Sequence, residues 1–291
     1  MKKTIFTGAA TALITPFKDG KIDYKSFSDI IEFQIKGGID ALVVCGTTGE
    51  ASTLSDEEHR EITAFCIEKV NKRVPVIAGT GSNDTSYAIE LSKFAESAGA
   101  DGVLLVTPYY NKASQNGLIH HFNAIADSIN IPCLLYNVPS RTGVNILPTT
   151  YYELSKNDNI VGFKEANGNI SSMAKTMSLV GDNLSMYSGD DDQTVPILSL
   201  GGKGVISVLS NILPTVVHDI CNLFFEGKIK ESRELQFKYL ELMNAMFCDV
   251  NPIPVKAAMS KLGHCLEDMR LPLYPLDDAN RAKLYKAMEI I

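Results

Sequence analysis

One residue of this 291-residue chain stands out as a candidate for covalent catalysis, because it is a lysine at the end of an apolar segment. It is Lys164, in the stretch NIVGFKEANG at residues 159–168. Residues two apart in a β-strand share a face, so a strand here would turn Lys164 to the same side as Gly162 and Ile160. Gly162 has no side chain and would leave space beneath the lysine stem.

The neighbouring carboxylate is badly placed to neutralise this lysine, because Glu165 would face the opposite side of the strand with Val161 and Phe163. Two interpretations of Lys164 therefore remain open. It is either a strand-end lysine that extends its ammonium into solvent, or an amine held in a pocket to react with a carbonyl group.

Other apolar segments of the chain also end in polar residues. These residues are Thr15-Pro16, Gly46-Thr47-Thr48-Gly49-Glu50, Gly79-Thr80-Gly81, Thr107-Pro108-Tyr109-Tyr110-Asn111, residues 136–143 (YNVPSRTG) and Ser188-Gly189-Asp190-Asp191-Asp192. If the segments are parallel strands of a barrel, their carboxyl ends meet at one rim, where such barrels hold their active sites. This convergence favours a reactive amine.

A reactive lysine at that rim can form a Schiff base with a ketone, and the adjacent carbon then loses a proton to become an enamine nucleophile. Partial burial would supply the unprotonated amine by lowering its pKa. Tyr136 is the best candidate for a proton shuttle. The GTTGE stretch at 46–50 offers hydroxyls and amides for a carboxylate. Each feature also has a purely structural interpretation: GTTGE as a turn, Tyr136 as a rim aromatic, and residues 79–81 as a tight loop.

The chain alternates strand-like and helix-like segments eight times. The strand-like runs are ATALIT from Ala10, ALVVC from Ala41, VPVIAG from Val74, GVLLV from Gly102, IPCLLY from Ile131, IVGFK from Ile160, SMYSG from Ser185 and GVISV from Gly204. Helical patterns lie between them, including residues 24–36, a helix opened by Ser55 and an acidic first turn, and one that follows residues 83–85 and runs to Ala98.

This alternation predicts a parallel sheet covered by helices. Eight units favour a (β/α)8 TIM barrel over a doubly wound sheet, and no GxGxxG motif follows the first strand. Strands stop near Leu213. The remainder is predicted as helices at 214–225, 228–247, 254–262 and 277–290. We expect a catalytic barrel over residues 1–226 and a C-terminal helical domain over 227–291.

Composition excludes several classes of protein. A hydrophobic content of 45%, a charged content of 21% and a net charge of −7 without a basic block are typical of a soluble globular protein and speak against nucleic-acid binding. No apolar run reaches the roughly 20 residues of a membrane span. The N-terminus (MKKTIFTGAATALITPF) faintly resembles a secretion signal, but threonines interrupt it, and we interpret it as mature protein.

The cysteines and histidines indicate neither a disulfide framework nor a metal site. Six scattered cysteines without a CxxC pair suit reduced thiols in the cytoplasm. Cys45, just before GTTGE, is expected to be a packed strand thiol. The five histidines show no ligand spacing, and His120 and His121 would point about 100° apart on a helix.

Eight stretches together resemble the dihydrodipicolinate synthase family, in the pyruvate-dependent, class I aldolase-like superfamily that includes N-acetylneuraminate lyase. They are GTTGE (46–50), PVIAGTGSN (75–83), VTPYYN (106–111), LYNVPSRTG (135–143), GFKEANGN (162–169), SGDD (188–191), GVISV (204–208) and NPIPVK (251–256). The resemblance implies a (β/α)8 barrel with C-terminal helices. It also implies a lyase that condenses pyruvate with L-aspartate 4-semialdehyde to 4-hydroxy-tetrahydrodipicolinate, on the diaminopimelate route to lysine, without a metal or organic cofactor.

The resemblance also implies roles at matching positions. Lys164 would carry the Schiff base, and Tyr136, Thr47 and Tyr110 would form a proton relay, with Tyr110 supplied by a neighbouring subunit. Thr48 would hold the carboxylate of pyruvate. The remaining substrate contacts would come from Arg141 (on the carboxylate of the second substrate), Gly189 and Ile206. A planar, two-pronged cation such as Arg141 suits that carboxylate.

The alternative within the superfamily is a lyase such as N-acetylneuraminate lyase or a 2-keto-3-deoxy sugar-acid aldolase. Arg141 and the Thr47-Thr48 pair favour the synthase. Two other classes stay open: a non-catalytic barrel, which the joint presence of Lys164, Tyr136, Thr47 and Arg141 disfavours, and an oxidoreductase or metal hydrolase on the same fold. The absence of a nucleotide motif and of clustered histidines disfavours the latter.

The resemblance further implies a homotetramer built from tight dimers and a vestigial regulatory site for lysine between subunits. The residues at that site are Ala51, Ser52, Asp56, His59, Asn83, Tyr87 and Tyr109. Asp56 stands where lysine-inhibited relatives have a histidine, and Tyr87 where they have a glutamate. Loss of that glutamate removes a charge-assisted contact worth about 1.5–3 kcal/mol, so we expect weak or absent inhibition by lysine.

Overall fold

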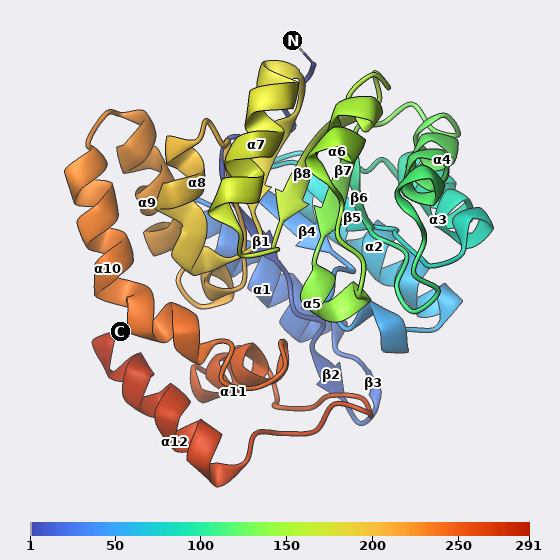
Figure 1. Ribbon diagram of the computed structural model, residues 1–291. Helices are drawn as coiled ribbons and strands as arrows, with labels where there is room; N and C mark the ends of the chain where they lie inside the picture. The colour runs from blue at the N-terminus through green and yellow to red at the C-terminus, as the bar shows by residue number, and fades with distance from the viewer. Residues whose placement is uncertain (1) are drawn as a thin grey trace.

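The computed structural model describes residues 2–291 and contains a closed barrel of eight parallel strands (Figure 1). The strands are β1 (Gly8–Ala12), β4 (Ala41–Val44), β5 (Val76–Gly79), β6 (Gly102–Val106), β7 (Cys133–Asn137), β8 (Ile160–Glu165), β9 (Ser185–Ser188) and β10 (Gly204–Ser207). Consecutive strands are neighbours, and β10 pairs with β1 to close the ring. The predicted (β/α)8 fold is confirmed.

Helices cover the outside of the barrel (Figure 1). They are α1 (Tyr24–Lys36), α2 (Asp56–Val70), α3 (Thr85–Ala98), α4 (Gln115–Ala126), α6 (Pro148–Leu154), α7 (Ile170–Val180), α8 (Thr194–Ser199) and α9 (Pro214–Phe225). The predicted helix starts are confirmed at two caps. Ser55 and Glu58 form a reciprocal capping box on α2, and the Asp84 side chain accepts a hydrogen bond from the Ser86 amide at the start of α3.

Strand bounds differ from the sequence prediction where the chain bends at the rim. The first strand begins at Gly8 and ends at Ala12, and a short unpredicted hairpin of β2 (Phe17–Lys18) and β3 (Lys21–Ile22) follows it. The prediction included Cys45 in the second strand, but β4 ends at Val44, because the backbone of Cys45 takes a left-handed φ of 56° that no strand can contain.

Two apolar layers hold the barrel together. The larger layer packs between the strands and the surrounding helices. The smaller one fills the barrel interior with residues such as Ala10, Ala41, Ile77, Leu134 and Ile206. Small alanines lie beside larger aliphatic side chains there, because inward-facing residues of all strands share and fill this narrow space.

The prediction of which side chains of β8 share a face is correct at the end of the strand and wrong at its start. The pairing of β7 with β8 shifts by one residue at Val161, a β-bulge. As a result Ile160 packs in the outer layer and Val161 in the interior, the reverse of the prediction. Beyond the bulge, Lys164 and Gly162 face the interior and Phe163 faces the helices.

The C-terminal residues form α10 (Ile229–Ala245), α11 (Ile253–Lys261) and α12 (Asp278–Ala287), followed by a single turn, η5 (Met288–Ile290). They extend to the end of the barrel opposite the N-terminus, where α5 (Pro139–Thr142) also lies (Figure 1). The proposed domain boundary at 226/227 falls in the turn between α9 and α10 and stays a prediction.

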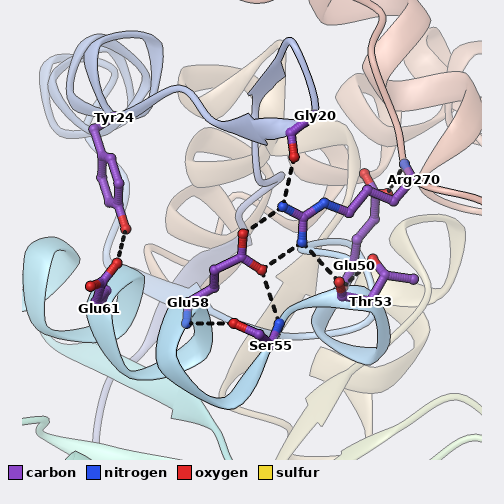
Figure 2. Close-up of polar contacts among 8 residues, drawn as sticks. All are labelled: Gly20, Tyr24, Glu50, Thr53, Ser55, Glu58, Glu61 and Arg270. Carbon is purple, nitrogen blue, oxygen red and sulfur yellow. Dashed lines mark hydrogen bonds and ion pairs between the residues drawn. The ribbon is translucent and has the colours of Figure 1, made fainter.

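One arginine fastens this extension to the barrel rim. Figure 2 shows the guanidinium of Arg270 donating to both carboxylate oxygens of Glu58 and to the carbonyls of Thr53 and Gly20. Bidentate pairing of this kind fixes orientation as well as distance. The C-terminal segment therefore holds the loop that leads from β4 to α2.

Within residues 2–291, no helix combines the length and apolar character needed to cross a membrane. The same residues contain no group of three or more His, Cys, Asp or Glu side chains arranged to hold a metal ion.

Candidate active site

Lys164 is buried at the carboxyl end of β8, with 6% of its surface exposed. Its ammonium nitrogen lies 4.4 Å from the centre of the Tyr136 ring, and the two residues are partners across β7 and β8. Burial lowers the pKa of Lys164 from its ordinary value of 10.5 to about 8, although Asp190 and Asp191 act in the opposite direction. The solvent-exposed interpretation of Lys164 is therefore wrong.

Glu165 faces away from the amine, as predicted. Its carboxylate accepts hydrogen bonds from the Tyr151 hydroxyl and the Asn137 side-chain amide on the outer side of the barrel. Burial raises the pKa of Glu165 to about 7. This carboxylate is engaged elsewhere and does not neutralise Lys164.

A different glycine from the one predicted makes room for the lysine stem. A Cβ on Gly162 would meet the Ser185 carbonyl at 2.4 Å and the Leu134 side chain at 3.0 Å, so that space is already filled. A Cβ on Gly189, by contrast, would lie 3.1 Å from Cε of Lys164 and 2.7 Å from Cβ of Ala166. Gly189 is thus the residue that lets the lysine extend into the cavity.

The barrel mouth contains a cavity of about 180 Å³ into which several predicted site residues converge. Its lining includes Lys164, Tyr136, Thr47, Thr48, Arg141 and Gly189. Burial raises the pKa of the Tyr136 phenol to about 12, against the opposing influence of Arg141 and of the Thr47 hydroxyl. The phenol is consequently neutral near pH 7 and can both donate and accept a proton beside the amine.

Two predicted site residues lie outside this lining. Ile206 is fully buried on β10, within the interior apolar layer. Tyr110 is 91% exposed on the loop after β6, and its backbone has a left-handed φ of 71°. The Tyr110 side chain is therefore exposed to solvent and does not line the cavity of its own chain.

Residues from three parts of the chain meet at one side of the cavity. The side-chain nitrogen of Asn251 donates to the Thr48 hydroxyl at 3.0 Å, and the Asn251 carbonyl accepts from Nη2 of Arg141 at 3.0 Å. Asn251 belongs to the NPIPVK stretch, which sequence reasoning matched to the family without giving the residue a role. Its contacts are long-range, and no local pattern announces them.

Asp190 is a second cavity residue for which sequence reasoning gave no role. It lines the cavity, and burial together with neighbouring Asp192 raises its pKa to about 6, while Lys164 lowers it. The run of three aspartates at 190–192 was visible in the sequence. Which aspartate faces the lysine depends on the turn after β9.

A buried ion pair connects the GTTGE loop to the C-terminal extension. The Glu50 carboxylate, whose backbone is left-handed at φ 54°, pairs with Lys256 of α11, and both side chains are fully buried. The Arg270 amide also donates to Glu50. The C-terminal extension thereby positions the loop that carries Thr47 and Thr48.

Five of the seven residues predicted for a vestigial lysine site line a second cavity of about 390 Å³ beside the first, whereas Asp56 and Asn83 lie outside its lining. Ala51, Ser52, His59, Tyr87 and Tyr109 line it, together with Thr47, Tyr136 and Arg141 of the main site. Asp56 is bound by the Tyr87 hydroxyl at 2.8 Å and by Arg60 at 3.1 Å, and the Asn83 carbonyl accepts from Asn111.

Cys45 also lines this second cavity and is 3% exposed. Burial raises its pKa to about 12, so the thiol stays protonated near neutral pH and is a poor nucleophile. This agrees with the predicted packed thiol, although Cys45 follows β4 and is not part of the strand.

Comparison with known proteins gives consistent matches over nearly the whole chain. Residues 5–291 match the Dihydrodipicolinate synthetase family. The chain is 55% identical over 276 residues to the 4-hydroxy-tetrahydrodipicolinate synthase of Clostridium perfringens (strain ATCC 13124), and the match covers 95% of each protein.

Solved structures agree with this result. The 4-hydroxy-tetrahydrodipicolinate synthase of the thermoacidophilic methanotroph Methylacidiphilum fumariolicum SolV has a TM-score of 0.96 at 46% identity, covering 98% of this chain and 95% of that one. The lysine-bound DHDPS of Cyanidioschyzon merolae has a TM-score of 0.96 at 39% identity, covering 99% of each chain. With its buried barrel-mouth lysine, this chain belongs to the dihydrodipicolinate synthetase family.

Proposed function

We propose that this protein is a lyase that condenses pyruvate with L-aspartate 4-semialdehyde to 4-hydroxy-tetrahydrodipicolinate, on the diaminopimelate route to lysine. The observation that carries the proposal is the buried amine of Lys164, held 4.4 Å from the centre of the Tyr136 ring in a cavity that also contains Thr48 and Arg141. Family membership supplies the identity of the two substrates.

The first half of the reaction joins pyruvate to the enzyme. The neutral amine of Lys164 adds to the ketone carbon, and loss of one water leaves a protonated imine. Tyr136 donates and accepts the protons that addition and dehydration require, with Thr47 as the next group of the relay. The Thr48 hydroxyl holds the carboxylate of pyruvate. Loss of a methyl proton then gives the enamine.

The second half forms the new carbon–carbon bond. Arg141 binds the carboxylate of the semialdehyde, and the enamine carbon attacks its aldehyde carbon to give a hydroxyl group. The amino group of the same substrate then attacks the imine carbon, which closes the ring and releases Lys164 as a free amine. One water leaves per condensation. The protonated imine that Lys164 forms with pyruvate is the electron sink, so this chemistry requires neither a metal nor an organic cofactor.

The proposal is tested by giving the purified protein both substrates and detecting the condensed product by mass spectrometry. We expect product from the native chain and none from Lys164→Ala. The alternative activity is tested in parallel with N-acetylneuraminate and a 2-keto-3-deoxy sugar acid. Cleavage of either acid, together with no condensation product, would overturn the proposal.

We further propose a homotetramer of tight dimers in which Tyr110 reaches the cavity of a neighbouring subunit. Its 91% exposure and left-handed backbone support this role. Sedimentation measures the oligomeric state. Tyr110→Phe should lower turnover and leave the oligomeric state unchanged. A fully active monomer would contradict the shared site.

A cytoplasmic location is part of the same proposal. It is supported by the six cysteines, all of them free thiols and five of them buried. Fractionation of cells that produce the protein would test it, and recovery from the exported fraction would contradict it.

A further inference from the structure

Asn251 lies between the two residues proposed to bind the substrate carboxylates. It is 6% exposed, lies in the segment between α10 and α11, and lines the cavity at the barrel mouth. Its side chain reaches Thr48, and its main chain reaches Arg141, each at 3.0 Å. One residue of the C-terminal extension thus contacts both halves of the substrate-binding surface.

The direction of the hydrogen bond to Thr48 decides what that hydroxyl can do. A hydroxyl has one proton to donate and lone pairs to accept with. Because Nδ2 of Asn251 donates to Oγ1 of Thr48, this contact occupies a lone pair and leaves the hydroxyl proton free. Thr48 is 2% exposed, so solvent offers that proton little alternative.

The other half of the amide fits this arrangement. Oδ1 of Asn251 is buried and has no hydrogen-bond partner among residues 2–291. If the amide were turned, Thr48 would donate to that oxygen and would have no proton left for a ligand. The native orientation, with Nδ2 toward Thr48, keeps the Thr48 donor available for a ligand.

We propose that Asn251 is a positioning residue for pyruvate: its side-chain amide holds the Thr48 hydroxyl so that the hydroxyl proton is directed at the pyruvate carboxylate. The inference rests on the proposed function, since it takes pyruvate as the ligand. Asn251 acts through Thr48, so its removal should weaken the binding of pyruvate and leave the chemical steps nearly unchanged. Its carbonyl, which holds Arg141, is present in every variant.

Three variants separate this role from a structural one. Asn251→Ala removes the donor and should raise the pyruvate concentration that half-saturates borohydride trapping on Lys164 by about tenfold, the worth of one hydrogen bond to a charged group. Asn251→Asp keeps the shape of the side chain but can only accept, so it captures the Thr48 proton and adds a negative charge. It should raise that concentration further, by about a hundredfold. Thr48→Val removes the hydroxyl itself.

A double-mutant cycle gives the decisive comparison. In the Thr48→Val background, Asn251→Ala should have no further effect on half-saturation, because its effect passes through the missing hydroxyl. In the wild-type background, kcat and the KM for the semialdehyde should stay within about twofold, because lost ground-state binding raises KM alone. The melting temperature of each variant is measured alongside.

Several outcomes would overturn the inference. They are a half-saturation in Asn251→Ala within twofold of wild type, an equal effect of that change with and without the Thr48 hydroxyl, or an aspartate variant no worse than the alanine variant. If the alanine variant fails to fold, the isosteric aspartate variant decides the question. Failure of the proposed function is distinguishable, because the wild-type protein would then form no pyruvate adduct.

Discussion

Replacing Lys164 by methionine should stabilise the folded protein at neutral pH, even though it removes the residue on which the proposed activity depends. The reason is that the native chain keeps an ionisable amine 6% exposed at the barrel mouth. Methionine has a similar length and no charge, so it fills the same space without the cost of burying an ammonium group.

The size of the effect follows from the pKa of the amine. Burial lowers this pKa from 10.5 to about 8. Each unit corresponds to 1.36 kcal/mol, so protonated Lys164 costs the folded state about 3 kcal/mol. The unfolded chain binds the proton more tightly than the folded chain. The cost is therefore present in full below pH 8, and it shrinks as the pH rises toward 10.5, where both states lose the proton.

Urea unfolding of the native chain and of Lys164→Met at pH 7 and pH 10 measures this difference. We expect the variant to be more stable by up to about 3 kcal/mol at pH 7, with a clearly smaller gap at pH 10. Lys230→Met, at a lysine whose side chain is 73% exposed, is the matched control and should change stability little at either pH. A methionine variant that is less stable at pH 7, or a gap that does not depend on pH, would refute the reasoning.

Three further predictions concern the rest of the site. Arg141→Ala should still form the borohydride-trapped pyruvate adduct, but kcat/KM for the semialdehyde should fall by about tenfold to a hundredfold. The reason is that the variant loses a charged contact to the semialdehyde alone. Loss of the adduct would contradict this. Lys256→Met should destabilise the chain by about 3–5 kcal/mol in urea unfolding, because it leaves the Glu50 carboxylate buried without its cationic partner. Adding Glu50→Gln should restore most of this loss. A double variant that is less stable than the single variant would contradict this. Lysine should inhibit weakly or not at all. Tyr87 stands where inhibited relatives are expected to present a free glutamate, and its hydroxyl already donates to Asp56. A sub-millimolar inhibition constant would contradict this.

The fold could be predicted from the sequence because its signal is repetitive. Eight apolar runs separated by helical patterns specify a parallel barrel even when single boundaries are off by a few residues. The bulge at Val161 could not be predicted, because an extra residue in one strand is defined by its pairing with β7, which the sequence of β8 does not contain. The hairpin of β2 and β3 was missed because each strand has two residues.

Some residues of the candidate site could likewise be predicted from the sequence, and others could not. Lys164 and Tyr136 lie at the carboxyl ends of their strands, and Thr47, Thr48 and Arg141 lie in the segments that follow strands. The rule that barrel sites lie at strand ends therefore locates all five. Asn251 enters the cavity from a segment that the barrel pattern does not include, more than 200 positions away from Thr48 in the sequence.

The burial of Lys164 is also a property of the assembled rim. Neighbouring strands and loops remove it from water, and no feature of its own segment distinguishes it from a lysine that reaches solvent. The segment NIVGFKEANG alone therefore permits both interpretations of Lys164, and the neighbouring strands and loops decide between them.

The central claim is that the amine of Lys164 bonds covalently to pyruvate. Borohydride reduction in the presence of pyruvate alone, followed by peptide mass spectrometry, tests it most directly. The account predicts one reduced pyruvate group on Lys164 and none on Lys164→Met. An unmodified Lys164, or a modification that persists at another lysine in the methionine variant, would contradict it.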